Sequence, residues 1–173
     1  SGVGKGYARG FEIFIQKKLS SIPIYGLMSL SINETRFTSI DGVERPGAFD
    51  ARAILNTAVG WRIYQEWEIS SKFRIASGLP TTPYINDRQS PLLGTLDFTQ
   101  YNSGDRLPIF HALDLRIDKR WSLRGLQIIS YIDIQNIYNR KNVSAFRWNR
   151  QTAQSEFISS IGILPSIGLN VEF

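Results

Sequence analysis

FHALDLRIDKRW, residues 110–121, alternates apolar with charged side chains over most of its length. Successive side chains of a β-strand point to opposite faces, so a period of two predicts a strand with one apolar and one charged face. The charged positions are Asp114, Arg116, Asp118 and Arg120. The apolar positions are Leu113, Leu115, Ile117 and Trp121.

The same alternation recurs along the chain, and no segment has a convincing helical period. Turn-forming residues separate the alternating segments, which together predict about eight antiparallel strands. Residues 79–109 are rich in Pro, Gly, Asn, Asp and Ser and predict one long loop. The other predicted strands lie within residues 7–18, 24–33, 53–63, 67–75, 126–139, 143–148 and 164–173.

The composition narrows the class of protein. The 173 residues are 42% hydrophobic with apolar runs of only a few residues, which excludes a helical membrane protein. Cysteine is absent, which removes disulfides, thiolate metal sites and cysteine nucleophiles. The net charge of +5 is spread along the chain, and aromatic residues share faces with aliphatic residues rather than with Lys and Arg. We therefore expect no nucleic-acid partner.

Alternation alone does not tell whether the apolar face lies inside or outside. A soluble barrel turns this face inward, whereas a membrane β-barrel turns it toward lipid and keeps its lumen polar. Two details favour a transmembrane β-barrel. Charges of both signs crowd one face of residues 110–121, as suits a hydrated lumen. Aromatic residues stand at or near apolar strand ends, as in the girdles of membrane barrels; these are Tyr7, Trp61, Trp67, Trp121 and Phe173.

No arrangement of residues predicts catalysis or a bound cofactor. The single histidine, His111, and the nearest acid, Asp114, are three residues apart on one strand, so their side chains point to opposite faces. Asp114 and Asp118 share a face, but Arg116 and Arg120 alternate with them, which favours mutual neutralisation over acid–base chemistry. No His, Asp or Glu cluster has metal-ligand spacing. We expect a protein that is not an enzyme and binds no metal or cofactor.

Five stretches, in this order, resemble the C-terminal part of the barrel of TonB-dependent receptors, the active transporters of the bacterial outer membrane. They are GYARGFEIFIQKKL at 6–19, SGLPTTPY at 77–84, RLPIFHALDLRIDKRW at 106–121, DIQNIYNRKNV at 133–143 and LPSIGLNVEF at 164–173. The resemblance implies a barrel of about 22 strands around a plug. Residues 1–173 would supply roughly the last eight of these strands, with no plug domain.

The resemblance also implies uptake of a scarce ligand and a set of partners. These are outer-membrane lipid, the barrel-assembly machinery, and the remaining strands and plug, supplied by the same receptor or by a partner chain. TonB would contact only regions that lie outside these residues. The final strand resembles the signal that the assembly machinery reads, through Ile167, Leu169, Val171 and Phe173.

Charged residues on the polar faces are candidates for the wall of the lumen. They would contact the plug or a passing ligand, or alternatively form a solvated face that maintains the barrel. These lumen candidates are Arg52, Arg62, Lys72, Arg74, Asp114, Arg116, Asp118 and Arg120.

Two other functions fit the same pattern. One is a small independent outer-membrane barrel with a structural or adhesive role, closed by pairing of its first and last strands. The other is a soluble ligand-binding β-barrel. The membrane interpretation contains a conflict, because one strand per segment and a periplasmic Phe173 would make the loop at 79–109 periplasmic too. Membrane barrels keep periplasmic turns short, so the conflict predicts a further strand near 92–101 or an exception to this rule.

Overall fold

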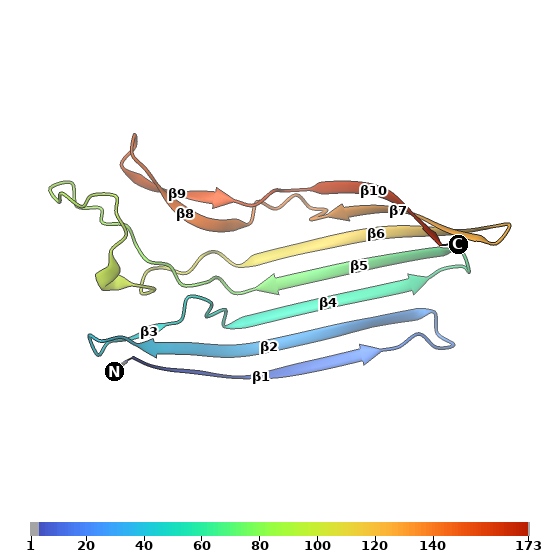
Figure 1. Cartoon of the computed structure of the whole chain (residues 1–173), viewed down its shortest axis with the longest axis horizontal. Helices are drawn as coiled ribbons and strands as arrows, with labels where there is room; N and C mark the ends of the chain where they lie inside the picture. Colours follow the sequence, from blue (N-terminus) through green and yellow to red (C-terminus); the bar gives the residue numbers. More distant parts are fainter. Residues whose placement is uncertain (1–3, 173) are drawn as a thin grey trace.

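The computed structural model describes residues 4–172 of the chain. These residues form strands and one short 3-10 helix, and they include no helix that is long and apolar enough to cross a membrane. The predicted all-β, antiparallel class is therefore confirmed (Figure 1). The elements are β1 Lys5–Lys17, β2 Ile24–Thr38, β3 Glu44–Pro46, β4 Ala53–Arg62, β5 Trp67–Ala76, η1 Phe98–Gln100, β6 Phe110–Leu123, β7 Leu126–Gln135, β8 Val143–Asn149, β9 Gln154–Ser159 and β10 Leu164–Glu172.

The long strands form one antiparallel sheet in the order β1-β2-β4-β5-β6-β7-β10, here called the main sheet. The order follows the sequence, except that the short β3 pairs beside the end of β2 and the chain leaves the sheet between β7 and β10. β1 and β10 stand at the two ends of this order. Within residues 4–172 they do not pair with each other, so the described sheet is open rather than closed into a barrel.

One predicted strand has a different partner from the one expected. Val143–Asn149 does not join the main sheet but pairs with Gln154–Ser159 in a separate hairpin. The other seven predicted strands all lie in the main sheet. β9 is not predicted from the sequence, because its two large apolar residues, Phe157 and Ile158, are adjacent and show no alternation.

The connections of the main sheet differ sharply between its two ends (Figure 1). The β6–β7 turn has only two residues, Arg124 and Gly125, with φ angles of 46° and 90°, as a tight hairpin with the twist of its strands requires. The short turns, at residues 18–23, 63–66 and 124–125, share one end with the end of β10. The long connections, at residues 39–52, 77–109 and 136–163, lie at the other end.

The predicted loop at 79–109 is confirmed, because residues 77–109 hold only η1 and two isolated bridges. The prediction that this loop lies at the same end of the sheet as the end of the last strand is wrong. Three strands of the main sheet follow the loop, since β8 is not among them, so the loop lies opposite the end of β10. No strand forms at 92–101, and the strands missing from the prediction are the three-residue β3 and β9.

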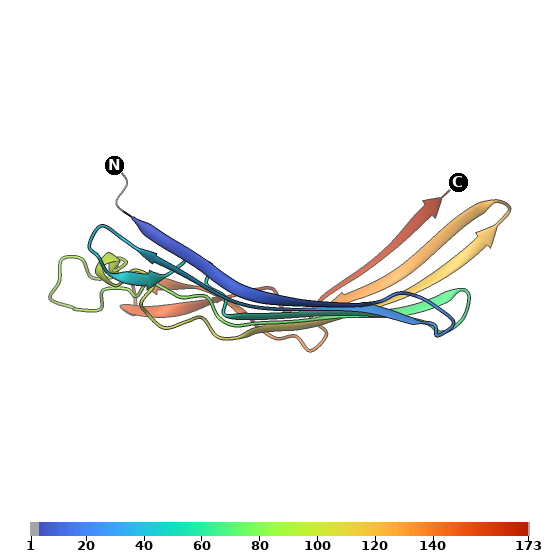
Figure 2. The ribbon, with the colours of Figure 1, turned by 90° about the horizontal axis from the view of Figure 1, so that it is seen from below.

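The register brings the apolar positions of all seven long strands onto one face. Ile69, Ile117, Ile132 and Ile167 occupy one cross-strand row, and the rows on either side continue the pattern. Figure 2 shows the main sheet as a single curved layer. The apolar face is uncovered: Ile132 is 52% exposed and Ile167 is 81% exposed.

Burial in this fold is the reverse of that in a soluble domain. Among the described residues, the only buried hydrophobic side chains are Ala51 and Ala76. A sheet must cover its apolar face to be stable, so the cover here has to come from outside residues 4–172. The buried polar side chains are Arg45, Asp50, Glu68, Asn102, Asp118, Asn136 and Asn142.

Candidate functional site

Seven of the eight lumen candidates share the polar face of the main sheet. The register pairs Lys72 with Asp114 and places Asp118 opposite Glu68, and side chains at paired positions lie on the same face. Arg52 is different, because it precedes β4 and its guanidinium contacts Asp50 in the long connections. The seven on the polar face are Arg62, Lys72, Arg74, Asp114, Arg116, Asp118 and Arg120.

Glu68 is the centre of a polar cluster that the candidate list omits. Its Oε2 accepts hydrogen bonds from Arg62 Nε at 3.1 Å and from Arg120 Nη2 at 2.9 Å, and its Oε1 accepts one from the Tyr25 hydroxyl. The Tyr25 ring reaches this position by crossing Gly60, where a Cβ atom would overlap it. Glu68 could have been found from sequence, since it alternates with Ser70, Lys72 and Arg74 on the predicted polar face.

A second cluster joins β6 and β7. Arg116 donates hydrogen bonds to both carboxylate oxygens of Asp118, the shortest from Nη2 at 2.7 Å. The same guanidinium lies 3.9 Å from the centre of the Tyr131 ring, at the distance of a cation–π contact. Tyr131 in turn covers Gly168 of β10, where a side chain would overlap the ring. The neutralisation of Asp118 by Arg116 agrees with the alternating charges in the sequence.

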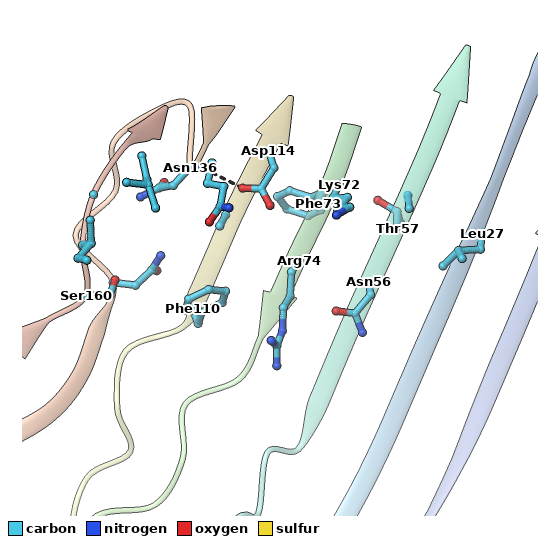
Figure 3. A pocket seen from close by; sticks show the side chains of 17 residues that line it. Leu27, Asn56, Thr57, Lys72, Phe73, Arg74, Phe110, Asp114, Asn136 and Ser160 are labelled. Carbon is cyan, nitrogen blue, oxygen red and sulfur yellow. Dashed lines mark hydrogen bonds between the residues drawn. The ribbon is translucent and has the colours of Figure 1, made fainter. Parts of the chain in front are cut away.

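A cavity of about 600 Å³ opens on the polar face near the long connections. Figure 3 shows Lys72 and Arg74 on β5 and Asp114 on β6 at its wall. The Asp114 carboxylate accepts a hydrogen bond from the Asn136 backbone N–H at 2.8 Å. Within the described residues Lys72 and Arg74 form no ion pair, and Asp114 is the one carboxylate in the cavity wall, so the wall carries two cations and one anion. This arrangement can bind an anionic group.

A second cavity of about 660 Å³ adjoins the first along the same face. Lys72, Leu27 and Ala58 line both cavities, so the two form one hollow across β2, β4 and β5. The second cavity extends to Tyr25 and Arg62 of the Glu68 cluster. The hollow therefore runs from the long connections toward the end with the short turns.

The long connections are tied together by a buried carboxylate. The Asp50 side chain is fully buried and accepts hydrogen bonds from the Thr35 backbone N–H at 2.7 Å, from Arg52 Nε at 2.8 Å and from Arg106 Nη2 at 2.5 Å. Burial raises the pKa of the Asp50 carboxyl, but the three donors outweigh burial and hold the pKa below its usual value. Arg106 also donates to the backbone carbonyl of Gly78, so residues 39–52 and 77–109 meet at this carboxylate.

Further contacts hold the same two connections against each other. Asn102 donates from its side chain to the Pro46 carbonyl at 2.9 Å, and buried Arg45 donates to the Thr99 carbonyl at 3.0 Å. Gly78 lies directly against the backbone carbonyl of Leu107, so the stretches SGLPTTPY and RLPIF pack side by side. Residues 39–52 and 77–109 are therefore held against each other, whereas the third long connection, 136–163, contributes to the wall of the polar hollow.

Asparagines turn the chain out of β7. Asn136 and Asn139 adopt left-handed φ angles of 51° and 56°, which asparagine tolerates better than most residues. Asn142 accepts from the His111 backbone N–H and donates to its carbonyl. This use of asparagine accounts for their density in the stretch DIQNIYNRKNV. The His111 ring contacts the Tyr138 hydroxyl at 2.7 Å, on the face opposite Asp114.

Three of the four residues proposed as an assembly signal lie in β10. Ile167, Leu169 and Val171 share the apolar face and are 81%, 71% and 48% exposed, while Phe173 lies outside the described residues. Among residues 4–172, no three His, Asp or Glu side chains gather where they could hold a metal ion.

No protein-family model matches the chain. No curated protein matches it either.

Proposed function

We propose that this chain forms part of the β-barrel of a TonB-dependent receptor of the bacterial outer membrane, which takes up a scarce ligand actively. The observation that carries the proposal is the two-faced sheet: one face is apolar and uncovered, and the other carries charges of both signs, among which Glu68 and Asp118 are buried and paired with arginines. Lipid is the environment that stabilises an uncovered apolar face across seven strands, and a hydrated lumen suits the charged face. The order of the five resembling stretches supports the family.

The lengths of the strands support a membrane position. A tilted strand needs about 9–11 residues to cross a bilayer. The strands of the main sheet have 9 to 15 residues, whereas β8 and β9, which lie outside it, have 7 and 6. The strands long enough to cross are therefore the ones that share the apolar face.

The open edges support membership of a larger barrel. β1 and β10 lack a strand partner on their outward sides within residues 4–172. Each unpaired backbone group in hydrocarbon raises the free energy of the protein by roughly several kcal/mol, so such edges have to be paired in a membrane. In the proposal, further strands of the same receptor or of a partner chain pair with both edges, and the barrel-assembly machinery recognises β10.

The two ends of the sheet agree with a defined orientation. Outer-membrane barrels have short periplasmic turns and longer extracellular loops. The proposal therefore makes the end with the turns at 18–23, 63–66 and 124–125 periplasmic, together with the end of β10. The loops joined by Asp50 become the extracellular surface that first meets a ligand. Lys72 and Arg74 become part of the wall that faces the plug or an anionic ligand group.

Labelling of introduced cysteines tests both membrane position and orientation, because residues 1–173 contain no cysteine. Gln89→Cys, in a long loop, is expected to react with a membrane-impermeant maleimide on intact cells, and Tyr64→Cys, in a short turn, only after lysis. Equal labelling of both on intact cells, or recovery of the protein in the soluble fraction, would refute the proposal.

The apparent mass separates a receptor from the small-barrel alternative. An antibody to residues 164–173 is expected to detect a heat-modifiable outer-membrane band several times heavier than the 19.7 kDa of these residues. An outer-membrane band near 19.7 kDa, with disulfide formation between cysteines introduced in β1 and β10, would instead establish a small closed barrel.

A further inference from the structure

A cation interrupts the apolar face near its end with the short turns. Lys119 of β6 is paired with Trp67 of β5 and with Ser130 of β7, and all three side chains belong to the apolar face. Its Nζ lies 4.7 Å from the centre of the Trp67 ring and 4.2 Å from that of Trp121. Two indole rings therefore hold a positive charge on a face whose other side chains in this region are uncharged.

Within residues 4–172 the ammonium group has one ion-pair partner, Glu66, which is mostly exposed and does not share a hydrogen bond with it. Glu66 Oε2 is 3.9 Å from Lys119 Nζ, beyond hydrogen-bond distance, and the Glu66 side chain is 66% exposed. The Trp121 indole N–H donates to the Ser130 hydroxyl at 3.0 Å, which fixes this ring, and an indole N–H cannot accept a hydrogen bond from the lysine. An ammonium carries three donors, and these remain available to an external anion.

The surface beside Lys119 has the shape and chemistry of a site for an acyl chain. A cavity of about 590 Å³ begins at Lys119 and the two tryptophans and continues over Ile117, Ile132, Ile167 and Leu169. The two tryptophans stand at the rim nearest the short turns, and Ile167 and Leu169 form the part of the cavity that lies over β10. A ligand for this cavity needs a negative head at one end and a hydrocarbon chain at the other.

We propose that this cavity binds an anionic phospholipid of the periplasmic leaflet, with its phosphate at Lys119 and one acyl chain along the isoleucines. The proposal rests on the membrane position and orientation proposed above. Charge complementarity selects the anionic head, and the aromatic pair places the lysine at the depth of the headgroups, where tryptophan is enriched. The same arrangement fixes the height of β6 relative to the bilayer.

Fluorescence quenching by brominated lipids tests the proposal. The native protein that carries these residues is reconstituted in phosphatidylcholine vesicles with a minor fraction of either dibromo-phosphatidylglycerol or dibromo-phosphatidylcholine. Subtraction of a Trp67→Phe/Trp121→Phe variant isolates the signal of the two indoles. We expect an association constant about fivefold higher for phosphatidylglycerol, the preference that attraction of one lysine to anionic lipid provides.

Variants assign the preference to one side chain. Lys119→Gln is expected to abolish it, Glu66→Gln to increase it, and the control Lys141→Gln, an exposed lysine in the long connection at the other end of the sheet, to leave it unchanged. Equal quenching by the two lipids in the wild type, or an unchanged preference in Lys119→Gln, would overturn the lipid site while leaving the membrane position intact. Absence of quenching by both lipids would overturn the membrane position itself, so the two failures are distinguishable.

Discussion

Ile167→Arg places a charge on the apolar face of β10. The native side chain is 81% exposed and lies in the row that contains Ile132 of β7 and Ile117 of β6. Within residues 4–172 the substitution removes little packing, because few atoms cover this side chain. Its effect therefore reports the medium that contacts the face.

The expected magnitude differs clearly between lipid and water. Arginine on the lipid-facing side of a barrel strand costs about 2–4 kcal/mol near the bilayer midplane. This corresponds to a fall of about 30-fold to about 700-fold in the folding equilibrium constant. At an exposed position in water the same substitution changes the free energy of unfolding by less than about 0.5 kcal/mol.

Ser166→Arg is the matched control. Ser166 is the adjacent residue, so its side chain is on the polar face, where it pairs in register with Asp133. An arginine there meets a carboxylate and water in the proposed lumen. We expect it to change the free energy of unfolding by less than about 0.5 kcal/mol.

The assay is equilibrium unfolding by urea of the native protein reconstituted in phosphatidylcholine vesicles. The unfolding midpoint of Ile167→Arg is expected to fall well below that of the wild type, and the midpoint of Ser166→Arg to stay with it. Equal midpoints for the two variants would refute the assignment of the apolar face to lipid. A larger loss in Ser166→Arg would mean that the two faces are exchanged.

Three further predictions concern the loops and the polar face. The folded pKa of Asp50 lies below the unfolded value of about 3.9, so its stabilisation of the loops is complete above about pH 4 and is lost as the pH falls through the folded pKa. The protection factors of the loop amides, which are corrected for the intrinsic pH dependence of hydrogen exchange, should fall at low pH in the wild type, whereas Asp50→Asn should lower them even at pH 7, and unchanged protection at pH 7 would contradict this role. Gly78→Ala forces a Cβ atom onto the Leu107 carbonyl and should destabilise the packing of the loops by about 1–3 kcal/mol, which is measured as faster proteolysis of residues 77–109. If the variant resisted proteolysis as well as the wild type does, the loops would not pack as described. Glu68→Gln deprives two arginines of their charge partner and should lower the free energy of unfolding in urea by about 1–3 kcal/mol. The control Glu12→Gln, at an exposed position, should lower it by less than about 0.5 kcal/mol. Equal losses in the two variants would exclude a special role for the Glu68 cluster.

Local alternation predicted individual strands well and their partners less well. Residues 110–121 and 126–135 form β6 and β7 with the faces that the period of two requires. Residues 143–148 are a strand as predicted, but periodicity contains no information on the partner, and they pair with β9 instead of the main sheet. The end of the sheet predicted for residues 77–109 was wrong for the same reason, because the count runs back from the last strand and one misassigned strand reverses the direction of every earlier crossing.

For the candidate site, too, the sequence predicts one feature and not another: it predicts the face of each charged side chain but not the partner of that side chain. Seven charged positions share the polar face because spacing along a strand determines the face of each side chain. Which of them pair depends on the register between strands. The register joins Glu68 to Arg62, Arg120 and Tyr25 and leaves Lys72 without an ion pair.

By itself, the sequence determined the all-β class, the two-faced strands and the long loop, because each depends on residues that are neighbours along the chain. Only the tertiary structure decided that the strands form one open layer, that its apolar face is uncovered, and that β8 leaves the sheet. It also decided that Asp50 joins two loops through Arg106, which is 56 positions away in sequence. Such contacts follow from the register and from chain reversals, whose effects accumulate over many residues and are not encoded in any short segment.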